Sequence, residues 1–331
     1  MVNNSLEISL KKLRLKTPLM TASGTSGHLD EFTALRNCKK IVKSLGAFVS
    51  KGVTLQPRIG NPEVRVIETP TGLLNSIGLQ NSGAKIFLEE EMPKTRRYEL
   101  PIIVNISANT VQEFADLAAY LVDNDESRLI SGIEVNVSCP NLKEHGAMFG
   151  TNPRAVERVV KAVRKKVGDR VLLITKLTPN VTDIKEPAKA AIVGGTDILS
   201  MINTLRGMAI DIENKSPFLG NISGGLSGPA IKPVGVYMVY DCFKNIPECR
   251  NRRVPIIGIG GISTWQDVVE YVLAGATAVG IGTAWFVNVH IFEEVVRGLQ
   301  GYLLEKDTTI NDLVGLATKH EKMIRVMHHG R

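Results

Sequence analysis

The sequence has few cysteines and few aromatic residues, and each shortage excludes a class of site. Its four cysteines are Cys38, Cys139, Cys242 and Cys249, and no two of them form a C-x-x-C pair. The chain therefore lacks the cysteine spacing of a zinc knuckle or an iron–sulfur centre. Aromatic residues make up only 5% of the 331 positions, so stacking platforms for nucleic acid are not expected.

Metal ligands and membrane anchors also find no support in the sequence. None of the six histidines is paired as H-x-x-x-H, so we predict no metal site. The run from Tyr271 to Phe292 passes 22 residues without Asp, Glu, Lys or Arg, which is long enough to span a bilayer. Its glycines, together with Asn288 and His290, indicate a buried strand, a glycine turn and a helix instead.

The first residues do not have the pattern of a secretion signal. Glu7, Lys11 and Lys12 fall where a signal peptide needs its apolar core. We therefore expect a cytoplasmic protein with no membrane association, whose thiols stay reduced. The net charge of +7 is modest for this length and fits a phosphate or carboxylate ligand as well as nucleic acid.

Short apolar runs rich in β-branched residues recur along the chain, separated by segments of helical period. There are eight such runs, at 18–23, 46–52, 101–107, 132–138, 171–177, 196–203, 255–261 and 277–283. Continuous apolar strands with helices between them indicate a parallel sheet covered on both faces. Eight β–α units favour a (β/α)8 TIM barrel of the α/β class. No G-x-G-x-x-G pattern follows a strand, which argues against a Rossmann domain.

Two intervals between predicted strands are much longer than the others. One follows the second strand, at 55–83, and one follows the sixth, at 205–228. Both leave the carboxyl ends of strands, so we expect extended functional loops at the C-terminal face of the barrel. No linker interrupts the pattern, and we predict a single catalytic domain over residues 1–331. Ser227 and Ser263 precede helical segments and are the expected N-caps.

Polar residues and glycines stand where each predicted strand ends. They are Ser23, Lys51, Asn105, Asn136 with Cys139, Lys176, Asn203 with Thr204, Gly260 with Gly261, and Gly282 with Thr283. In a barrel all of them would meet at one mouth. A single asparagine at such a place is more often a turn residue, but the recurrence at every strand end favours a site.

The glycines after the seventh and eighth strands favour a phosphate ligand. Bare backbone amides form anion sites, and barrels commonly bind phosphate at this position. Tight turns are the alternative use of these glycines. The chain thus suits a cofactor with a phosphate tail.

The side chains at the other strand ends suit a planar heterocycle. Four asparagines offer donors and acceptors without charge: Asn75, Asn105, Asn136 and Asn203. Lys51 and Lys176 would face an anion or an electron-rich ring, unless they extend to solvent. Cys139 could serve as a general base, although most cysteines are simply small buried residues.

These motifs together resemble those of class 1B dihydroorotate dehydrogenases, the NAD-linked branch of that family. The matching stretches are ASGTSG (22–27), SKGVTLQPRIGNPEVRVIETPTGLLNSIGLQN (50–81), EVNVSCPN (134–141), TKLTPNVTDI (175–184), INTLRGMAID (202–211), GNISGGLSGPAIKP (220–233), IIGIGGI (256–262) and GIGTAWF (280–286). The likeness runs almost continuously from about 18 to 286. A cysteine at position 139 resembles class 1 enzymes, since class 2 enzymes carry serine there.

The resemblance implies an oxidoreductase that uses FMN to convert (S)-dihydroorotate into orotate in de novo pyrimidine (UMP) biosynthesis. It implies a flavin site at Ser23, Lys51, Gly52, Asn105, Asn136, Lys176, Ile202, Gly228, Gly260, Gly261, Gly282 and Thr283. It implies a substrate site at Lys51, Asn75, Ser76, Ile77, Gly78, Leu79, Asn136, Asn203 and Thr204. Cys139 would remove the C5 proton while hydride leaves C6 for N5 of FMN, and Lys176 would steady negative charge on the reduced flavin.

The resemblance also implies a partner, because this chain has neither a dinucleotide fingerprint nor cluster cysteines. The family's electron-transfer subunit carries FAD and a [2Fe–2S] cluster and passes electrons to NAD. Two such subunits flank a homodimer of catalytic subunits, which makes a heterotetramer. Ser82, His145 and the lengthened segment 242–253 depart from the family pattern. His145 puts the behaviour of the loop over the substrate in question.

Two other functions fit part of the same pattern. One is an oxidoreductase for uracil-like dihydropyrimidines that lack the carboxylate, which Lys51 and competition by orotate would discriminate. The other is a flavin-binding protein without catalysis, which has no need of a base such as Cys139.

Overall fold

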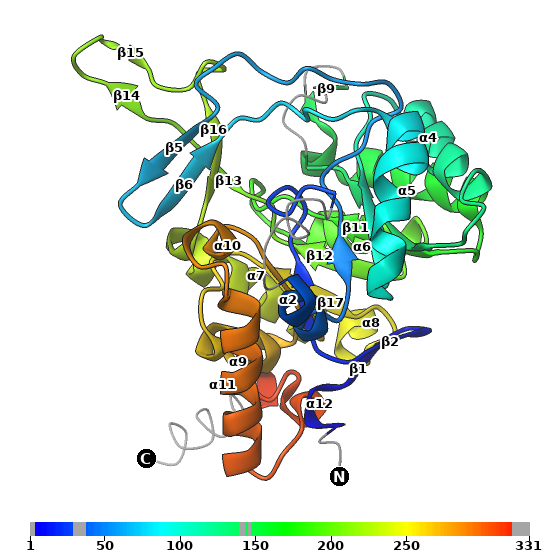
Figure 1. Ribbon diagram of the computed structural model, residues 1–331, viewed down its shortest axis with the longest axis vertical. Coiled ribbons are helices and arrows are strands. Elements are labelled where there is room, and N and C mark those ends of the chain that lie inside the picture. The colour runs from blue at the N-terminus through cyan, green and yellow to red at the C-terminus, as the bar shows by residue number, and fades with distance from the viewer. Residues whose placement is uncertain (1–3, 29–37, 139–142, 145–146, 320–331) are drawn as a thin grey trace.

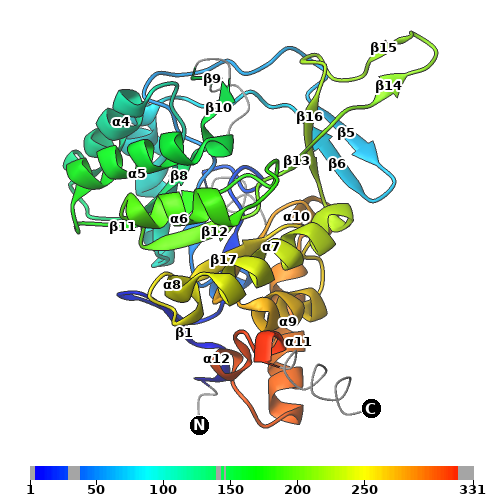
Figure 2. The same ribbon diagram turned by 180° about the vertical axis from the view of Figure 1, so that it is seen from behind.

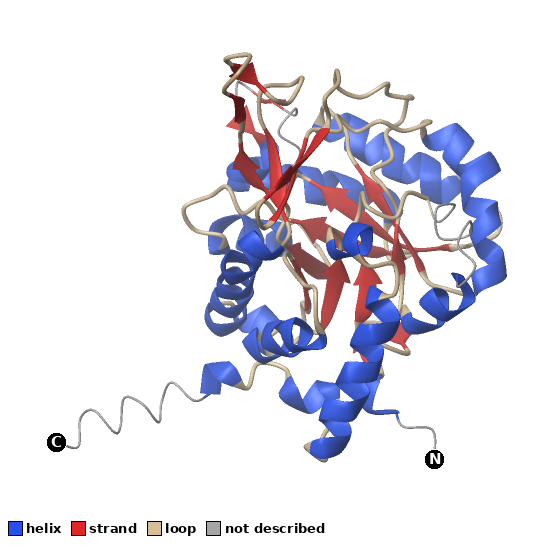
Figure 3. Cartoon of the chain, turned by 60° about the vertical axis from the view of Figure 1, so that its left-hand side comes forward, coloured by secondary structure: helices blue, strands red, loops and turns tan. Residues whose placement is uncertain are grey.

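The computed structural model describes residues 4–28, 38–138, 143–144 and 147–319, and a parallel eight-stranded sheet lies at its centre. In chain order the strands are β3 (Leu19–Thr21), β4 (Phe48–Val49), β7 (Ile102–Ile106), β8 (Ile130–Asn136), β11 (Leu172–Lys176), β12 (Ile198–Met201), β17 (Ile256–Ile259) and β18 (Ala278–Ile281). In space the order is β3-β18-β17-β12-β11-β8-β7-β4. A parallel bridge between Met20 and Ala47 connects the two ends of that order. The sheet is thus the nearly closed (β/α)8 barrel that the sequence predicts (Figure 3).

Helices surround this sheet (Figures 1 and 2). The longer ones are α2 (Cys38–Ser44), α4 (Val111–Asp123), α5 (Pro153–Val167), α6 (Lys185–Val193), α7 (Lys232–Asn245), α9 (Trp265–Ala274) and α11 (Ile291–Glu305). Shorter turns are η1 (Asn4–Leu6), α3 (Ala84–Ile86), η2 (Phe87–Glu91), η3 (Met92–Tyr98), η4 (Phe149–Thr151), η5 (Pro229–Ile231), α8 (Pro247–Arg250), α10 (Ala284–Val287) and α12 (Ile310–Leu313). Two small hairpins complete the elements outside the barrel and its mouth: β1 (Ile8–Leu10) with β2 (Leu13–Leu15), and β9 (Lys143–Glu144) with β10 (Ala147–Met148).

Helix α5 illustrates how the sequence pattern produces these layers. Its buried side chains recur with helical period: Ala155, Val156, Val159, Val160, Val163 and Val167. Lysines occupy the exposed face, so the apolar stripe packs inward. Asn152 caps the helix, because its Oδ1 accepts hydrogen bonds from the backbone N–H groups of Arg154 (3.0 Å) and Ala155 (3.3 Å).

The two long intervals do not remain loops, which corrects the sequence prediction. The interval after β4 supplies β5 (Val66–Thr69) and β6 (Gly72–Asn75), and the interval after β12 supplies β13 (Leu205–Gly207) and β16 (Gly224–Ser227). These strands form one antiparallel sheet in the order β13-β16-β6-β5. A further hairpin, β14 (Ile210–Asp211) with β15 (Ser216–Pro217), projects beyond it (Figure 1). The pairing satisfies backbone groups that two separate loops would leave to solvent.

Both predicted N-caps were wrong. Helix α9 is capped by Thr264, one residue after Ser263, because Thr264 Oγ1 accepts a hydrogen bond from the N–H of Asp267 (3.3 Å). Ser227 ends β16, and its hydroxyl oxygen accepts a hydrogen bond from Thr283 Oγ1 (2.8 Å). Gly228 takes the cap position of η5 instead.

The charge-free run 271–292 is divided among α9, β18, α10 and α11, as the sequence indicates. In the part of the chain that the structure describes, no helix has the length and hydropathy to cross a membrane. The segment 242–253 ends α7, forms α8 and leads into the amino end of β17. It therefore lies at the opposite end of the barrel from the carboxyl ends of the strands.

Candidate active site

Two adjoining cavities lie at the carboxyl ends of the barrel strands. The first has a volume of about 730 Å³ and the second about 750 Å³. Both are lined by Ser23, Gly24, Asn75, Ile77, Asn203 and Thr204, so they form one continuous space. The volume of each cavity lies in the range typical of cofactor and substrate sites.

The structure brings the sequence-predicted site residues to these cavities wherever it describes them. Besides shared residues, the first cavity is lined by Lys176, Ile202, Gly228, Gly260, Gly261, Gly282 and Thr283. The second is lined by Lys51, Gly52, Ser76, Gly78, Leu79, Asn105 and Asn136. Cys139 and His145 lie outside the described residues, so their positions remain predictions.

Glycine backbone forms one end of the first cavity. Gly260 and Gly261 have φ angles of +126° and +69°, which L side chains rarely adopt. A Cβ atom on Gly261 would lie 2.7 Å from Lys232 Cβ and 2.8 Å from the carbonyl oxygen of Gly228. The backbone leaves no room for a side chain at Gly261, and we call the turn of Gly260 and Gly261 the cradle.

Groups behind the cradle hold this backbone in place. The hydroxyl of Tyr271 donates a hydrogen bond to the carbonyl oxygen of Gly260 (2.7 Å), and burial raises the pKa of Tyr271, so the hydroxyl keeps its proton. Lys232 Nζ donates to Asp267 Oδ1 (2.8 Å) and also pairs with Glu270 (2.7 Å). The hydrogen bonds that Lys232 donates to both carboxylates raise its pKa.

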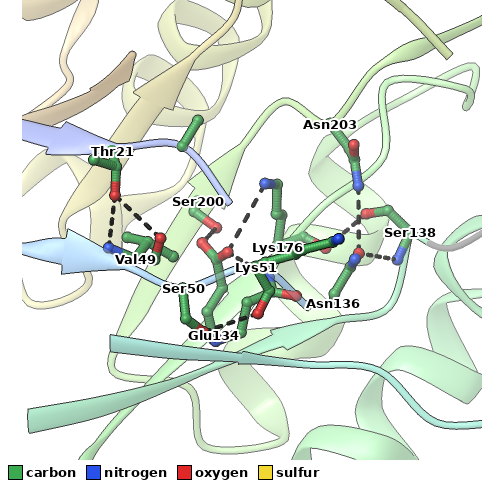
Figure 4. Close-up of polar contacts among 12 residues, drawn as sticks. Thr21, Val49, Ser50, Lys51, Glu134, Asn136, Ser138, Lys176, Ser200 and Asn203 are labelled. Atoms are coloured by element: carbon green, nitrogen blue, oxygen red, sulfur yellow. Dashed lines mark hydrogen bonds and ion pairs between the residues drawn. The ribbon is translucent and has the colours of Figure 1, made fainter. Parts of the chain in front are cut away.

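Two asparagines that line the second cavity, Asn136 and Asn203, are joined by hydrogen bonds (Figure 4). Asn203 Nδ2 donates to Asn136 Oδ1 (3.3 Å), and the same oxygen accepts from the N–H of Ser138 (3.2 Å). Ser138 Oγ donates to the carbonyl oxygen of Lys176 (2.8 Å). These contacts tie β8, β11 and the end of β12 together at the mouth.

The antiparallel sheet β13-β16-β6-β5, which we call the mouth sheet, supplies the remaining wall of the second cavity. Asn75 Nδ2 donates to the carbonyl oxygen of Gly225 (3.1 Å), which joins β6 to β16. Asn61 Nδ2 donates to both the carbonyl oxygen (3.1 Å) and the hydroxyl (2.8 Å) of Ser76. Ser82, which departs from the family pattern, donates to Glu91 Oε1 (2.7 Å).

A carboxylate inside the barrel was missed by sequence reasoning. Glu134 is only 2% exposed, and its Oε1 accepts a hydrogen bond from Asn105 Nδ2 (2.6 Å) and lies 3.8 Å from Lys176 Nζ. Its Oε2 accepts from Ser200 Oγ (2.7 Å). Glu134 stands two residues before Asn136 on β8, so strand alternation could have placed both on one face.

The donor set fits a planar cofactor with a phosphate tail, such as FMN. Asn105 Oδ1 is buried without a hydrogen-bond partner among the described residues, which suits a ligand that brings its own donor. At the far end, the cradle of Gly260 and Gly261 presents backbone where an anion would bind. No group of three or more His, Cys, Asp or Glu residues placed to hold a metal occurs within the described ranges.

Comparison with known proteins gives a consistent family. A sequence model described as dihydroorotate dehydrogenase matches residues 5–303. Curated relatives named dihydroorotate dehydrogenase B (NAD(+)), catalytic subunit, include those of Pelobacter propionicus and Geobacter sp. (strain M21), 46% and 43% identical over 94% of this chain and 97% of the relative. The protein of that name from Trichlorobacter lovleyi is 46% identical over 94% of this chain and 98% of its own length.

Proposed function

This chain belongs to the dihydroorotate dehydrogenase family, whose NAD-linked catalytic subunits are its relatives, and we propose that it oxidises (S)-dihydroorotate to orotate with FMN as its cofactor. One observation carries the proposal. The two adjoining cavities join a glycine cradle at one end to an asparagine cluster at the other. A phosphate-tailed flavin needs an anion cradle, and a dihydropyrimidine ring needs uncharged hydrogen-bonding groups beside it.

The flavin is held from phosphate to ring by successive strand ends. Gly228, Gly260, Gly261, Gly282 and Thr283 receive the phosphate, and Ser23, Lys51, Gly52, Asn105, Asn136, Lys176 and Ile202 surround the rest. When bound, FMN supplies an acceptor for the hydride that leaves C6 of the substrate. Lys176, which is 5% exposed, provides positive charge beside the first cavity.

The substrate is oriented by uncharged hydrogen-bonding groups. Asn75 through Leu79, Asn136, Asn203 and Thr204 bind the ring, and Lys51 binds its carboxylate. Cys139 takes the C5 proton as general base, a role that rests on the resemblance. The described amides can each donate and accept, so they read both N–H and C=O groups of the ring.

Electrons leave through a second protein. The relatives are named as catalytic subunits, which supports a separate electron-transfer subunit. By the family resemblance that subunit carries FAD and a [2Fe–2S] cluster, and the assembly is a heterotetramer built on a homodimer of this chain. The proposed reaction, oxidation of dihydroorotate to orotate, is a step of pyrimidine biosynthesis.

An anaerobic titration of the purified chain tests the proposal. Its visible spectrum is taken first, and dihydroorotate is then added while bleaching of the flavin absorption is followed. We expect that neither NAD nor fumarate reverses the bleaching of the chain alone. NAD should reverse it once the partner subunit is supplied. Rapid reoxidation by fumarate would contradict the NAD-linked assignment, and a flavin that dihydroorotate never bleaches would point to another dihydropyrimidine.

Replacing the proposed base gives a sharper prediction. Cys139→Ala should leave FMN bound and the fold intact, and should slow flavin reduction by dihydroorotate by about 10² or more, the usual scale for loss of a general base. Stopped-flow measurement of the half-reaction checks this. Cys38→Ala, on helix α2, is the matched control. Unchanged half-reaction kinetics in Cys139→Ala would remove the thiol from its role.

A further inference from the structure

Glu134 is a buried carboxylate that the proposed chemistry does not use. It lies inside the barrel and is only 2% exposed. Charged side chains are almost never buried to this degree unless they are paired. Apolar residues in place of a buried ion pair are commonly as stable or more so. Packing alone therefore does not explain a glutamate at this position.

Three neighbouring strands direct polar groups at this carboxylate. Asn105 on β7 is the register partner of Glu134, and its Nδ2 donates to Oε1 (2.6 Å). Ser200 on β12 donates to Oε2 (2.7 Å). Lys176 on β11 is the register partner of Ser200, and its Nζ lies 3.8 Å from Oε1 (Figure 4). One oxygen atom of Glu134 thus faces two groups that line the cavities.

The contact with Asn105 decides which end of that amide faces the ligand. Because Nδ2 donates to Glu134, Oδ1 is the amide atom left to accept from a ligand, and it is buried with no hydrogen-bond partner among the described residues. A Cβ atom on Gly52, another lining residue, would lie 3.3 Å from this oxygen. The cavity wall therefore presents an acceptor here.

The contact with Lys176 fixes its ammonium at the cavity wall. Lys176 is 5% exposed, and a buried charge needs a partner of opposite sign close by. The carboxylate of Glu134 lies 3.8 Å from Lys176 Nζ and supplies this partner. Ser200 contacts the far oxygen, Oε2, and not the Oε1 that Asn105 and Lys176 share.

We propose that Glu134 is a positioning residue for the flavin, which turns the Asn105 amide so that its oxygen is free to accept from the bound ring and holds the Lys176 ammonium at the cavity wall. This inference rests on the proposed function, because it assumes that the cavities hold FMN. Glu134 itself is separated from the ligand by the two residues on which it acts.

Glu134→Gln tests the inference, with Ser200→Ala as the matched control. Glutamine keeps the shape but cannot serve both Asn105 and Lys176 as a charged acceptor, whereas Ser200→Ala removes a donor and leaves both contacts to Oε1. We expect apoprotein carrying Glu134→Gln to bind FMN about tenfold more weakly by fluorescence quenching, the scale of one hydrogen bond to a charged group. Ser200→Ala should change that affinity less than threefold.

A double-variant cycle separates positioning from simple structural support. If Glu134 acts through Asn105, the affinity lost in Glu134→Gln with Asn105→Ala should be much less than the product of the two single losses. The midpoint potential of bound FMN gives a second readout. It should become more positive in Glu134→Gln, because the charge of Lys176 is uncompensated, and should return toward the wild-type value in Glu134→Asp.

Losses that multiply, or a Glu134→Gln potential equal to that of wild type, would overturn the inference. These measurements use FMN and a chemical reductant, without dihydroorotate. A wild-type chain whose flavin dihydroorotate fails to bleach would therefore reject the proposed reaction while leaving the role of Glu134 to be judged by its own data. A wild-type chain that bound no FMN would reject both.

Discussion

A single glycine sets the shape of the cavity at the end where we propose that the phosphate binds. Gly261 has φ of +69°, and a Cβ atom there would meet Lys232 Cβ at 2.7 Å and the Gly228 carbonyl oxygen at 2.8 Å. Gly261→Ala should therefore displace the cradle backbone and weaken FMN binding by about tenfold or more, since charge-assisted contacts to the anion are lost. Fluorescence titration of the apoprotein measures the change.

Gly168→Ala is the control for backbone strain alone. Gly168 also has positive φ (+56°), but a Cβ atom there would have nothing within 4 Å. The substitution should cost about 1 to 3 kcal/mol of stability and leave FMN affinity unchanged. Equal effects of the two substitutions on FMN affinity would mean that the cradle does not bind the phosphate.

Asn203 lines both cavities, and we propose that it binds the substrate. Its Nδ2 donates to Asn136 Oδ1 (3.3 Å), and its Oδ1 accepts from the N–H of Thr204 (2.8 Å). Asn203→Ala should weaken orotate binding about fivefold, the effect of one net hydrogen bond, with a smaller change in FMN affinity. Asn214→Ala, on the exposed β14–β15 hairpin, is the control. If flavin were lost first, the division of the site would be wrong.

The strand ends could be predicted from the sequence, but the groups beneath them could not. Eight apolar runs with polar ends place Lys176 and Asn136 at the mouth of any barrel. The hydrogen-bond partners of Glu134 are Asn105 and Ser200, which lie 29 and 66 positions away along the chain. A glutamate within one strand carries no sign of those partners until the register of neighbouring strands is known.

At the scale of elements, the start of α9 stabilises the phosphate cradle through Asp267. Its Oδ2 accepts from the N–H groups of Ser263 and Thr264 (both 2.8 Å), and Oδ1 accepts from Lys232 (2.8 Å). Burial pushes the pKa of Asp267 upward, but the hydrogen bonds from Lys232 and the helix start outweigh it and leave the pKa lowered. The charged form is therefore favoured by folding.

Asp267→Asn should destabilise the protein in a pH-dependent way. Because the pKa of Asp267 is lower in the folded state, its charge contributes its full stabilisation above the unfolded-state pKa of 3.8. This contribution is lost as the pH falls through the pKa of the folded state. We expect the free energy of unfolding of the wild type to exceed that of Asp267→Asn by about 2 kcal/mol at pH 7. The difference should become smaller as the pH falls below the pKa of the unfolded state. Urea unfolding at pH 7 and pH 3 measures it.

Asp312→Asn is a matched control for the capping interaction. Asp312 forms the same capping box with Thr309 at α12, but it is exposed, and no lysine among the described residues forms an ion pair with it. Its replacement should cause a smaller loss at pH 7. A gap that did not depend on pH for Asp267→Asn would contradict the role of its charge.

The mouth sheet was beyond prediction at this scale for a physical reason. Leu74 on β6 pairs with Leu226 on β16, and these strands come from intervals separated by four barrel strands in the chain. The strands are short and half-buried, so the alternation of buried and exposed residues is weak. Length and position indicated functional segments, but only tertiary pairing turns them into a sheet.

The whole barrel separates its ligand cavities from two cysteines at its opposite end. Cys242 on α7 and Cys249 on α8 are fully buried. Burial raises the pKa of Cys249 to about 12 and that of Cys242 well above its usual value. Because alkylation requires an exposed thiolate, both residues should react only after this part of the structure opens.

Labelling of these thiols therefore reports whether the barrel unfolds as one unit. If α7 and α8 open only with the whole barrel, FMN at 100 times its Kd should slow labelling of Cys242 and Cys249 about a hundredfold, by mass action on the folded state. Iodoacetamide labelling followed by peptide mass spectrometry measures both sites. Cys38, half-buried on α2, is the internal control and should react at a rate less sensitive to FMN. Equal rates at Cys242 and Cys249 with and without FMN would mean that α7 and α8 open locally while the cavities stay intact.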